Sequence, residues 1–276
     1  MRQVIDRLGS ILSLFSFDCP EWGVGEIASR LGLAKSTVSE LLTSLASQGF
    51  VERTRRGRYR LGWRLFTLNQ VLLESTPLVR ESRREMQELV ERHGESSHLM
   101  VLERDRAVIV ERMQASVAAH LLMYRVGLRL PAHCSSCGKV LLASRPWGEV
   151  ARIFDDVELQ RLTPNTIGDL ATLRTEVERV RVTGVAHDRE EIVPGLSCVA
   201  APVRDETGAV IAAISISVPT YRISGDEPRY ERMIVECAQR ISRRLGFVDD
   251  GAAARRDPPV RPMPLPQRNT QRSRNA

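Results

Sequence analysis

Hydrophobic residues recur at helical spacing through the first third of the chain, as in helices that bury one face. The spacing predicts helices at residues 4–16, 24–31, 34–48, 63–73 and 78–93. Gly32 lies in the short turn between the second and third of these helices, where glycine tolerates a positive φ. Gly49 lies where the third helix would end, and the residues after it read as two short strands, 50–53 and 58–61. We therefore predict a helical unit that is followed by a β-hairpin.

The second half of the chain mixes strand and helix patterns. Strands are predicted at residues 98–102, 107–110, 199–203 and 209–218. Helices are predicted at residues 135–144, 147–155, 169–182 and 226–245. Such mixing favours a separate α/β domain, so the chain as a whole falls in the α+β class.

Composition shifts suggest where these parts begin and end. Pro77 separates a first domain, residues 1–76, from a charged linker helix at 77–95. A second domain follows at 96–248. Residues 249–276 hold five prolines and six arginines with few apolar residues, so we expect this tail to be disordered.

The net charge of +6 is unevenly distributed. Residues 1–76 hold ten Arg or Lys against seven Asp or Glu, and the tail from Arg255 holds six Arg against one Asp. The region between them is therefore slightly acidic. A basic first domain fits a polyanionic partner.

The first domain carries the pattern of a winged helix-turn-helix. The helix at 34–48 opens with small polar or basic residues, and in such motifs this end enters the major groove. The candidate contacts there are Lys35, Ser36, Thr37 and Ser39. Five arginines lie on the hairpin, of which Arg55, Arg56 and Arg58 are the candidate phosphate contacts. A domain that only bound other proteins would not need so many arginines on one hairpin.

Four runs of sequence resemble the IclR family (isocitrate lyase regulator family) of bacterial transcriptional regulators. They are VGEIASRLGLAKSTV at 24–38, GFVERTRRGRYRLG at 49–62, LPAHCSSCGKVLLA at 130–143 and GVAHDREEIVPGLSCVAAPV at 184–203. The resemblance spans residues 1–248. It departs from the usual family pattern at Glu40 in the predicted recognition helix and at Ser136 and Cys137.

The resemblance implies an N-terminal winged helix-turn-helix, a linker helix and a C-terminal GAF-like α/β domain that binds an effector. It implies a dimer or tetramer that binds a double-stranded DNA operator and controls a catabolic operon, more often as a repressor. The implied effector is a small carboxylate or an aromatic acid. The effector-binding residues that it implies are Leu122, Leu130, Ser136, Cys137, Asp188, Cys198, Ser215 and Ser217.

Two features agree with such a site without the resemblance. Ser215 and Ser217 are two residues apart on a predicted strand, so they share one face and need buried partners. The segment from Cys134 to Cys137 opens a helix, whose free N–H groups favour an anion. The alternative is that both serines bond to neighbouring backbone.

Cysteines offer a second interpretation. Cys134, Cys137 and Cys198, with His133 and His187 near them in sequence, could bind zinc or respond to redox state. Packing is the simpler role, because cysteine fills small buried gaps well, and we expect no other cofactor. A cysteine-dependent enzyme is a remote alternative, since the common catalytic motifs are missing from the sequence. We find no signal peptide or membrane span, and expect a cytoplasmic protein with free thiols.

Overall fold

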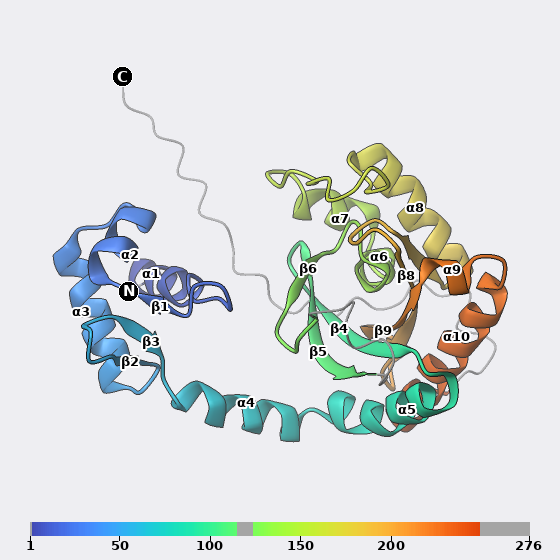
Figure 1. Ribbon diagram of the computed structural model, residues 1–276, viewed down its shortest axis with the longest axis horizontal. Coiled ribbons are helices and arrows are strands. Elements are labelled where there is room, and N and C mark those ends of the chain that lie inside the picture. Colours follow the sequence, from blue (N-terminus) through green and yellow to red (C-terminus); the bar gives the residue numbers. More distant parts are fainter. Residues whose placement is uncertain (1, 115–123, 249–276) are drawn as a thin grey trace. The chain divides into compact units, whose positions relative to one another are not determined.

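The computed structural model describes residues 2–114 and 124–248 (Figure 1). The chain forms two compact units, Met1–Thr76 and Pro77–Ala276. Leu122 and the tail at 249–276, both named above, lie outside the described residues. In residues 2–114 and 124–248, no helix is both long and apolar enough to cross a membrane.

The first unit packs three helices against a small sheet. The helices are α1 (Arg2–Leu12), α2 (Val24–Leu31) and α3 (Lys35–Ser47). The strands are β1 (Glu21–Trp22), β2 (Val51–Arg53) and β3 (Tyr59–Leu61), which pair antiparallel in the order β1-β3-β2. Ile11, Ile27, Val38 and Leu42 form the centre of its core and are inaccessible to solvent. The hydrophobic spacing read from the sequence thus matches the buried faces of α2 and α3, whereas Val4 and Ile5 of α1 are exposed.

The turn between α2 and α3 depends on glycine. Gly32 ends α2 with a φ of 64°, in the left-handed region that residues with a side chain rarely adopt. The backbone N–H of Leu33 then donates to the carbonyl of Ala28 at 3.0 Å and completes the helix end. This turn sets the direction in which α3 starts.

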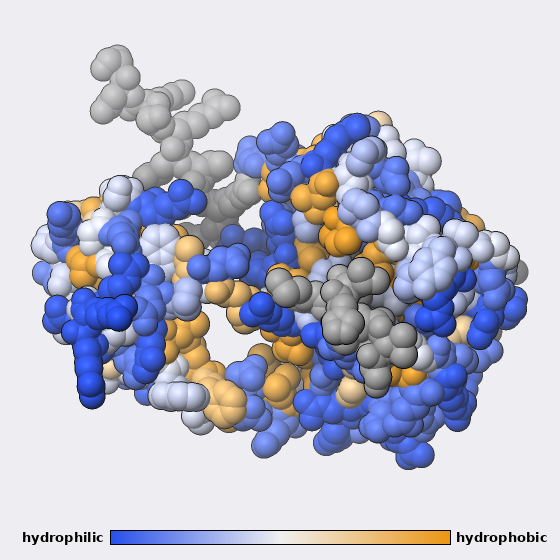
Figure 2. Space-filling model, in the orientation of Figure 1, coloured by the Kyte–Doolittle hydropathy of each residue, from blue (hydrophilic) through white to orange (hydrophobic). Residues whose placement is uncertain are grey.

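Helix α4 (Arg64–Ser75) follows the hairpin and buries no residue. Its large apolar side chains are exposed, and Figure 2 shows hydrophobic residues at the surface along this helix. The exposed residues at its start and along it are Trp63, Phe66, Leu68, Val71 and Leu72. A surface of this kind points to a partner.

The second unit is built on a six-stranded sheet in the order β6-β5-β4-β9-β8-β7, in which every neighbouring pair is antiparallel. Its strands are β4 (Ser96–Glu103), β5 (Arg106–Met113), β6 (Arg129–Pro131), β7 (Ala186–Arg189), β8 (Leu196–Arg204) and β9 (Val210–Pro219). The sheet is curled and has helices on both faces (Figure 1).

Each face of the sheet has its own hydrophobic core. On one face lie α6 (Ser136–Ala143), α7 (Trp147–Ile153) and α8 (Leu170–Thr183). On the other face lie α5 (Pro77–His93), α9 (Thr220–Ile223) and α10 (Glu227–Arg244). The stretch expected to be a linker helix thus packs through α5 against the sheet and α10, with Met86 and Leu89 buried. We place α5 within the second unit.

Several expectations need correction. The first helix was expected to continue to residue 16, but α1 ends at Leu12. Residues beyond it turn back so that the indole Nε1 of Trp22 donates to the carbonyl of Leu14 at 2.9 Å. The short elements β1, β6, β7 and α9 were not predicted, because two to four residues carry too little periodicity to reveal an element.

Candidate functional site

The exposed face of α3 presents the residues predicted to contact DNA. Lys35, Ser36 and Ser39 are exposed and Thr37 is half-buried. They are oriented outward because Val38, Leu42 and Leu45 on the opposite side of α3 are buried in the core. Thr43, which the sequence analysis did not select, lies one turn after Ser39 on the same exposed face.

The hairpin between β2 and β3 projects two arginines. The backbone N–H of Thr54 donates to the carbonyl of Arg58 at 2.7 Å and closes the turn. Gly57 within it has a φ of 75°. Arg55 and Arg56 at the tip are exposed, whereas Tyr59 anchors the hairpin in the core. The tip is therefore a basic wing held by a buried base.

Arg58 differs from the other two wing candidates, because it is engaged within the protein. Its guanidinium pairs with the Glu26 carboxylate of α2 at 2.7 Å and donates to the backbone carbonyl of Glu21 at 2.9 Å. Glu26 in turn accepts from the backbone N–H of Gly23 at 2.8 Å, and Arg58 lowers the pKa of this carboxyl. Arg58 thus ties the wing to α2 and β1.

Strand register aligns polar side chains on the α6 face of the large sheet. Ser217 lies opposite Cys198, and Cys198 lies opposite Asp188, so the three form one row across β9, β8 and β7. Ser215 and His98 lie opposite one another in the adjacent row. Because side chains alternate along a strand, all five point to the same face.

These side chains line a cavity, which we call the polar cavity. It is small and partly open to solvent, with a cavity volume of about 10 Å³, which is room for about one water molecule. Six of the predicted effector residues line it, namely Leu130, Ser136, Asp188, Cys198, Ser215 and Ser217. Cys137 is instead buried in the adjoining core, where its thiol donates to the carbonyl of Ala213 at 3.6 Å. Leu122 cannot be placed.

Five residues that line the polar cavity were not among the predicted effector-binding residues: His98, Met100, Tyr124, Ser135 and Ile192. His98 had a usable signal, because it is the first residue of an otherwise apolar predicted strand. Tyr124 had none, since the sequence around it matches no periodic element. Its ring lies edge-on to that of His98, with the centroids 5.3 Å apart.

Burial sets the protonation of the cavity groups. It raises the pKa of Asp188 to about 7 and lowers that of His98 to about 3. Among the described residues, the Nε2 atom of His98 and the hydroxyl of Tyr124 have no hydrogen-bond partner. The cavity therefore offers polar atoms that a ligand or water can satisfy.

A buried lysine connects α6 with the loop that follows β7. Lys139 is 2% exposed, and its Nζ donates to the carbonyl of His187 at 2.8 Å and pairs with the Glu191 carboxylate. The backbone N–H of Glu191 donates to Asp188 at 2.7 Å. Lys139 can reach this position because Gly138 packs against Ala132, where a Cβ would lie 2.3 Å from the carbonyl oxygen.

The cysteines do not assemble into a ligand set in the described part of the chain. The Cys134 thiol donates to the carbonyl of Pro131, that of Cys137 to Ala213, and Cys198 contacts the hydroxyl of Ser217 at 3.2 Å. Burial raises the pKa of Cys134 and Cys137 to about 12 and that of Cys198 well above its usual value. Burial therefore opposes the thiolate form that zinc binding and redox chemistry use.

Comparison with known proteins follows the same two-unit division. Residues 4–55 match the IclR helix-turn-helix domain, and residues 70–243 match the family described as bacterial transcriptional regulator IclR C-terminal. The chain is 36% identical to the HTH-type transcriptional regulator KdgR of Dickeya chrysanthemi over 252 residues, which cover 88% of this chain and 82% of that protein. It is 30% identical to the HTH-type transcriptional repressor AllR of Klebsiella pneumoniae over 247 residues, which cover 89% and 90%.

A solved structure shows a similar fold. The IclR homolog from Microbacterium hydrocarbonoxydans, complexed with 4-hydroxybenzoate, has a TM-score of 0.73 and is 29% identical. The match covers 88% of this chain and 98% of that one. The helix-turn-helix unit and the curled sheet of the second unit lie in the residues that the two family descriptions match. The chain therefore belongs to the IclR family of bacterial transcriptional regulators, and it is a DNA-binding regulator of transcription rather than an enzyme.

Proposed function

We propose that the protein binds a roughly palindromic operator through α3 and the wing, and that a small organic acid in the polar cavity changes its DNA affinity. The observation that carries this proposal is a small cavity lined by polar side chains in the unit that follows the helix-turn-helix unit. An effector of this kind alters DNA binding only by the difference between its affinities for the two conformations.

The proposed DNA contacts are the exposed residues of α3 and the tip of the wing: Lys35, Ser36, Thr37, Ser39, Arg55 and Arg56. Arg58 is assigned to positioning the wing, because its guanidinium is paired with the Glu26 carboxylate.

Fluorescence anisotropy tests the proposed DNA contacts by comparing binding to DNA from upstream of the gene with binding to scrambled DNA over a series of salt concentrations. Preferential binding with a steep salt dependence supports the assignment, and equal binding with a flat dependence refutes it.

The proposed effector is a compact carboxylate, aliphatic or aromatic. The cavity as it stands has room for about one water molecule, so its side chains must shift to admit an effector, and a compact acid needs the smallest shift. Ser135 and Ser136 at the start of α6 border the cavity, where free backbone N–H groups favour an anion. The structure complexed with 4-hydroxybenzoate contains an acid of this class. Asp188, partly protonated near neutral pH, can donate a hydrogen bond to such a ligand.

Thermal unfolding of the full chain with pyruvate, glycerate and 4-hydroxybenzoate as probes tests the effector proposal. An acid that binds the folded state raises the unfolding temperature, and the rise grows with the logarithm of its concentration over its Kd. The variant Asp188→Asn should lose this shift, whereas the exposed control Asp155→Asn should keep it. A shift that is equal in both variants would place the ligand elsewhere.

We also propose that the protein acts as a homo-oligomer that represses its operon in the cytoplasm, where the operator DNA lies. A helix of twelve residues without a buried side chain is marginal in water, so a second copy packed on α4 would stabilise it. The relative AllR is called a repressor. Reporter transcription with and without the gene checks the direction, since deletion of a repressor raises expression and deletion of an activator lowers it.

A further inference from the structure

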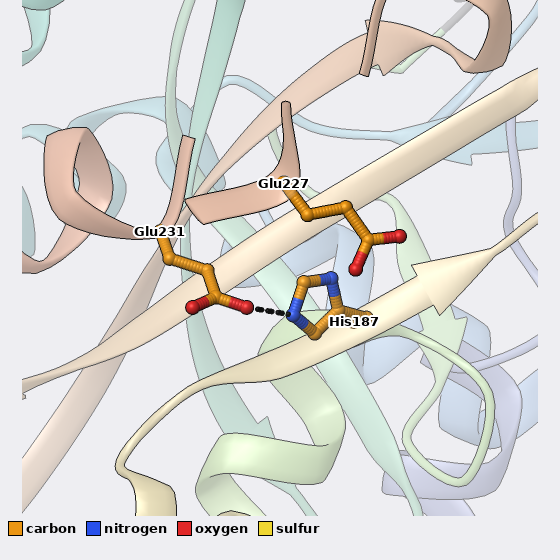
Figure 3. A group of neighbouring side chains, drawn as sticks. All are labelled: His187, Glu227 and Glu231. Carbon is orange, nitrogen blue, oxygen red and sulfur yellow. Dashed lines mark hydrogen bonds and ion pairs between the residues drawn. The ribbon is translucent and has the colours of Figure 1, made fainter. Parts of the chain in front are cut away.

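One side-chain cluster on the other face of the sheet belongs neither to the DNA-binding surface nor to the polar cavity. His187 lies on β7 opposite Val199 and points toward α10, away from the side of the strand that carries Asp188. Glu227 and Glu231, one helical turn apart on α10, flank its imidazole ring (Figure 3). One nitrogen of His187 and one oxygen of each glutamate all lie within 4.8 Å of one another.

We propose that His187, Glu227 and Glu231 form a binding site for a divalent transition-metal ion of the Zn²⁺ type. One imidazole and two carboxylates are ligands that these ions accept. Three protein ligands leave a further coordination position, which solvent can fill. The site shares His187 with the zinc site considered from the sequence, but it contains none of the three cysteines.

The distances suit such an ion. Bonds of about 2.0–2.2 Å at tetrahedral angles place their donor atoms about 3.4 Å apart. His187 Nε2 and Glu231 Oε1 are 2.9 Å apart, so a small outward shift of the exposed Glu231 lets an ion replace the proton that they now share. Glu227 must move closer, and its side chain is 39% exposed and able to do so.

Two arginines compete with a cation at this site, and neither contact is a strong obstacle. Arg189 pairs with Glu227 at 2.9 Å, but both side chains are largely exposed and such pairs contribute little. Arg179 interacts with Glu231 electrostatically, yet its hydrogen bonds go to Glu176 on its own helix and to the carbonyl of Val185. An ion therefore needs to displace only the Arg189 contact.

His187 is prepared for coordination. It is 3% exposed, and burial lowers its pKa, which favours the neutral ring that a metal ion binds. Its backbone carbonyl is held by Lys139 at 2.8 Å, which limits movement of the strand. The ligand with the least freedom is thus already in place, and the two mobile glutamates can close around the ion.

The location gives the ion a consequence for regulation, and this part rests on the proposed function. His187 and Asp188 are neighbours on β7 whose side chains point to opposite faces of the sheet. Lys139 contacts both His187 on this strand and Glu191 in the loop after it, and the backbone N–H of Glu191 donates to the Asp188 carboxyl. Metal binding on one face is therefore expected to change the polar cavity on the other.

Calorimetric titration of the full chain with ZnCl₂ tests the site. The variant Cys19→Ser serves as the background, because Cys19 is the one exposed thiol among the described residues. We expect one ion per chain, and affinity at least about tenfold lower in Glu227→Gln and in Glu231→Gln. The control Glu236→Gln, an exposed position on the same helix, should bind normally. Arg189→Ala should bind more tightly, because it removes the competing cation.

Absence of binding, or equal affinity in Glu227→Gln, Glu231→Gln and the control, would overturn the site. Circular dichroism of each variant confirms folding, and both glutamates are exposed enough for substitution to be tolerated. The titration uses neither DNA nor effector, so its failure is distinguishable from failure of the proposed function.

A second measurement compares operator affinity with and without ZnCl₂. Zinc that binds without changing operator affinity in the background protein, or that changes it equally in Glu231→Gln, would overturn the regulatory role.

Discussion

His98 shows how burial alone controls a titratable side chain. It is inaccessible to solvent, its Nδ1 lies 3.4 Å from the Ser217 hydroxyl, and no carboxylate pairs with it among the described residues. Desolvation therefore disfavours its charged form and lowers its pKa to about 3. The same desolvation raises the pKa of Asp188 to about 7, because the charged form of an acid is the anion.

The pKa of His98 predicts a pH dependence of folding. An unfolded histidine titrates near pH 6.5, so below that pH the unfolded chain binds a proton that the folded chain does not. The stabilisation is complete above about pH 6.5 and is lost as the pH falls toward the folded pKa, at about 1.4 kcal/mol per pH unit. The free energy of unfolding, measured with urea at several pH values between these limits, should change less steeply with pH in His98→Gln than in the unaltered chain. An equal dependence on pH in both proteins would mean that folding does not lower the pKa of His98.

Thiol exposure gives a second prediction at this scale. Cys134, Cys137, Cys198 and Cys237 are buried and Cys19 is exposed. Reaction of the native protein with a disulfide reagent at neutral pH should modify one thiol per chain quickly, and unfolding should release all five. The variant Cys19→Ser should show no fast phase. A second fast-reacting thiol would show that the cavity opens readily and would revive the thiol-based alternative.

The wing shows how an element assigns different roles to similar residues. Arg55 and Arg56 extend from the tip, whereas Arg58 turns back toward Glu26 and the carbonyl of Glu21. The sequence presents the three as equivalent. Only the closure of the turn and the position of α2 separate phosphate contacts from a residue that positions the wing.

This difference can be measured through salt dependence. Arg55→Ala and Arg56→Ala should each weaken binding to operator and scrambled DNA alike, and should lower the salt slope by about 0.9 for each phosphate that the variant no longer neutralises. Arg58→Ala should weaken binding with a nearly unchanged slope, because it removes a support of the wing and leaves the phosphate contacts in place. A slope reduced by Arg58→Ala as much as by Arg55→Ala would show that Arg58 reaches DNA, as the sequence pattern suggests.

At the scale of the molecule, α4 is the element whose apolar residues the described chain leaves uncovered. Leu68 and Leu72 lie one turn apart and share one face of the helix, with Val71 beside them. The second unit, by contrast, covers both faces of its sheet with helices. The molecule thus buries its large sheet internally, and α4 is the helix that we propose for contact with another copy.

Substitution of apolar residues on α4 should therefore disrupt the oligomer while each chain remains folded. Leu68→Glu combined with Leu72→Glu should shift the protein from oligomer to monomer in analytical ultracentrifugation, and should weaken binding to a palindromic operator. Val182→Glu serves as control, because Val182 on α8 is 88% exposed and lies outside α4. An unaltered oligomer in the double variant would place the interface elsewhere.

The sequence by itself determined the features that depend on neighbours along the chain. Helical periodicity identified α2, α3, α5, α8 and α10, and glycine identified the turn before α3. Alternation placed Ser215 and Ser217 on one face of a strand, and they do lie on the same side of β9. The ordered motifs indicated the family. Local stereochemistry and hydrophobic spacing are sufficient for all of these inferences.

Tertiary structure alone decided which distant segments meet. The row of Ser217, Cys198 and Asp188 follows from strand register, and a shift of one residue would turn each strand's side chains to the opposite face. Packing placed His98 in the polar cavity and Cys137 in the core beside it. It also brought His187 to Glu231, which is 44 residues away in sequence. Such pairings depend on long-range packing and desolvation, which no local pattern encodes.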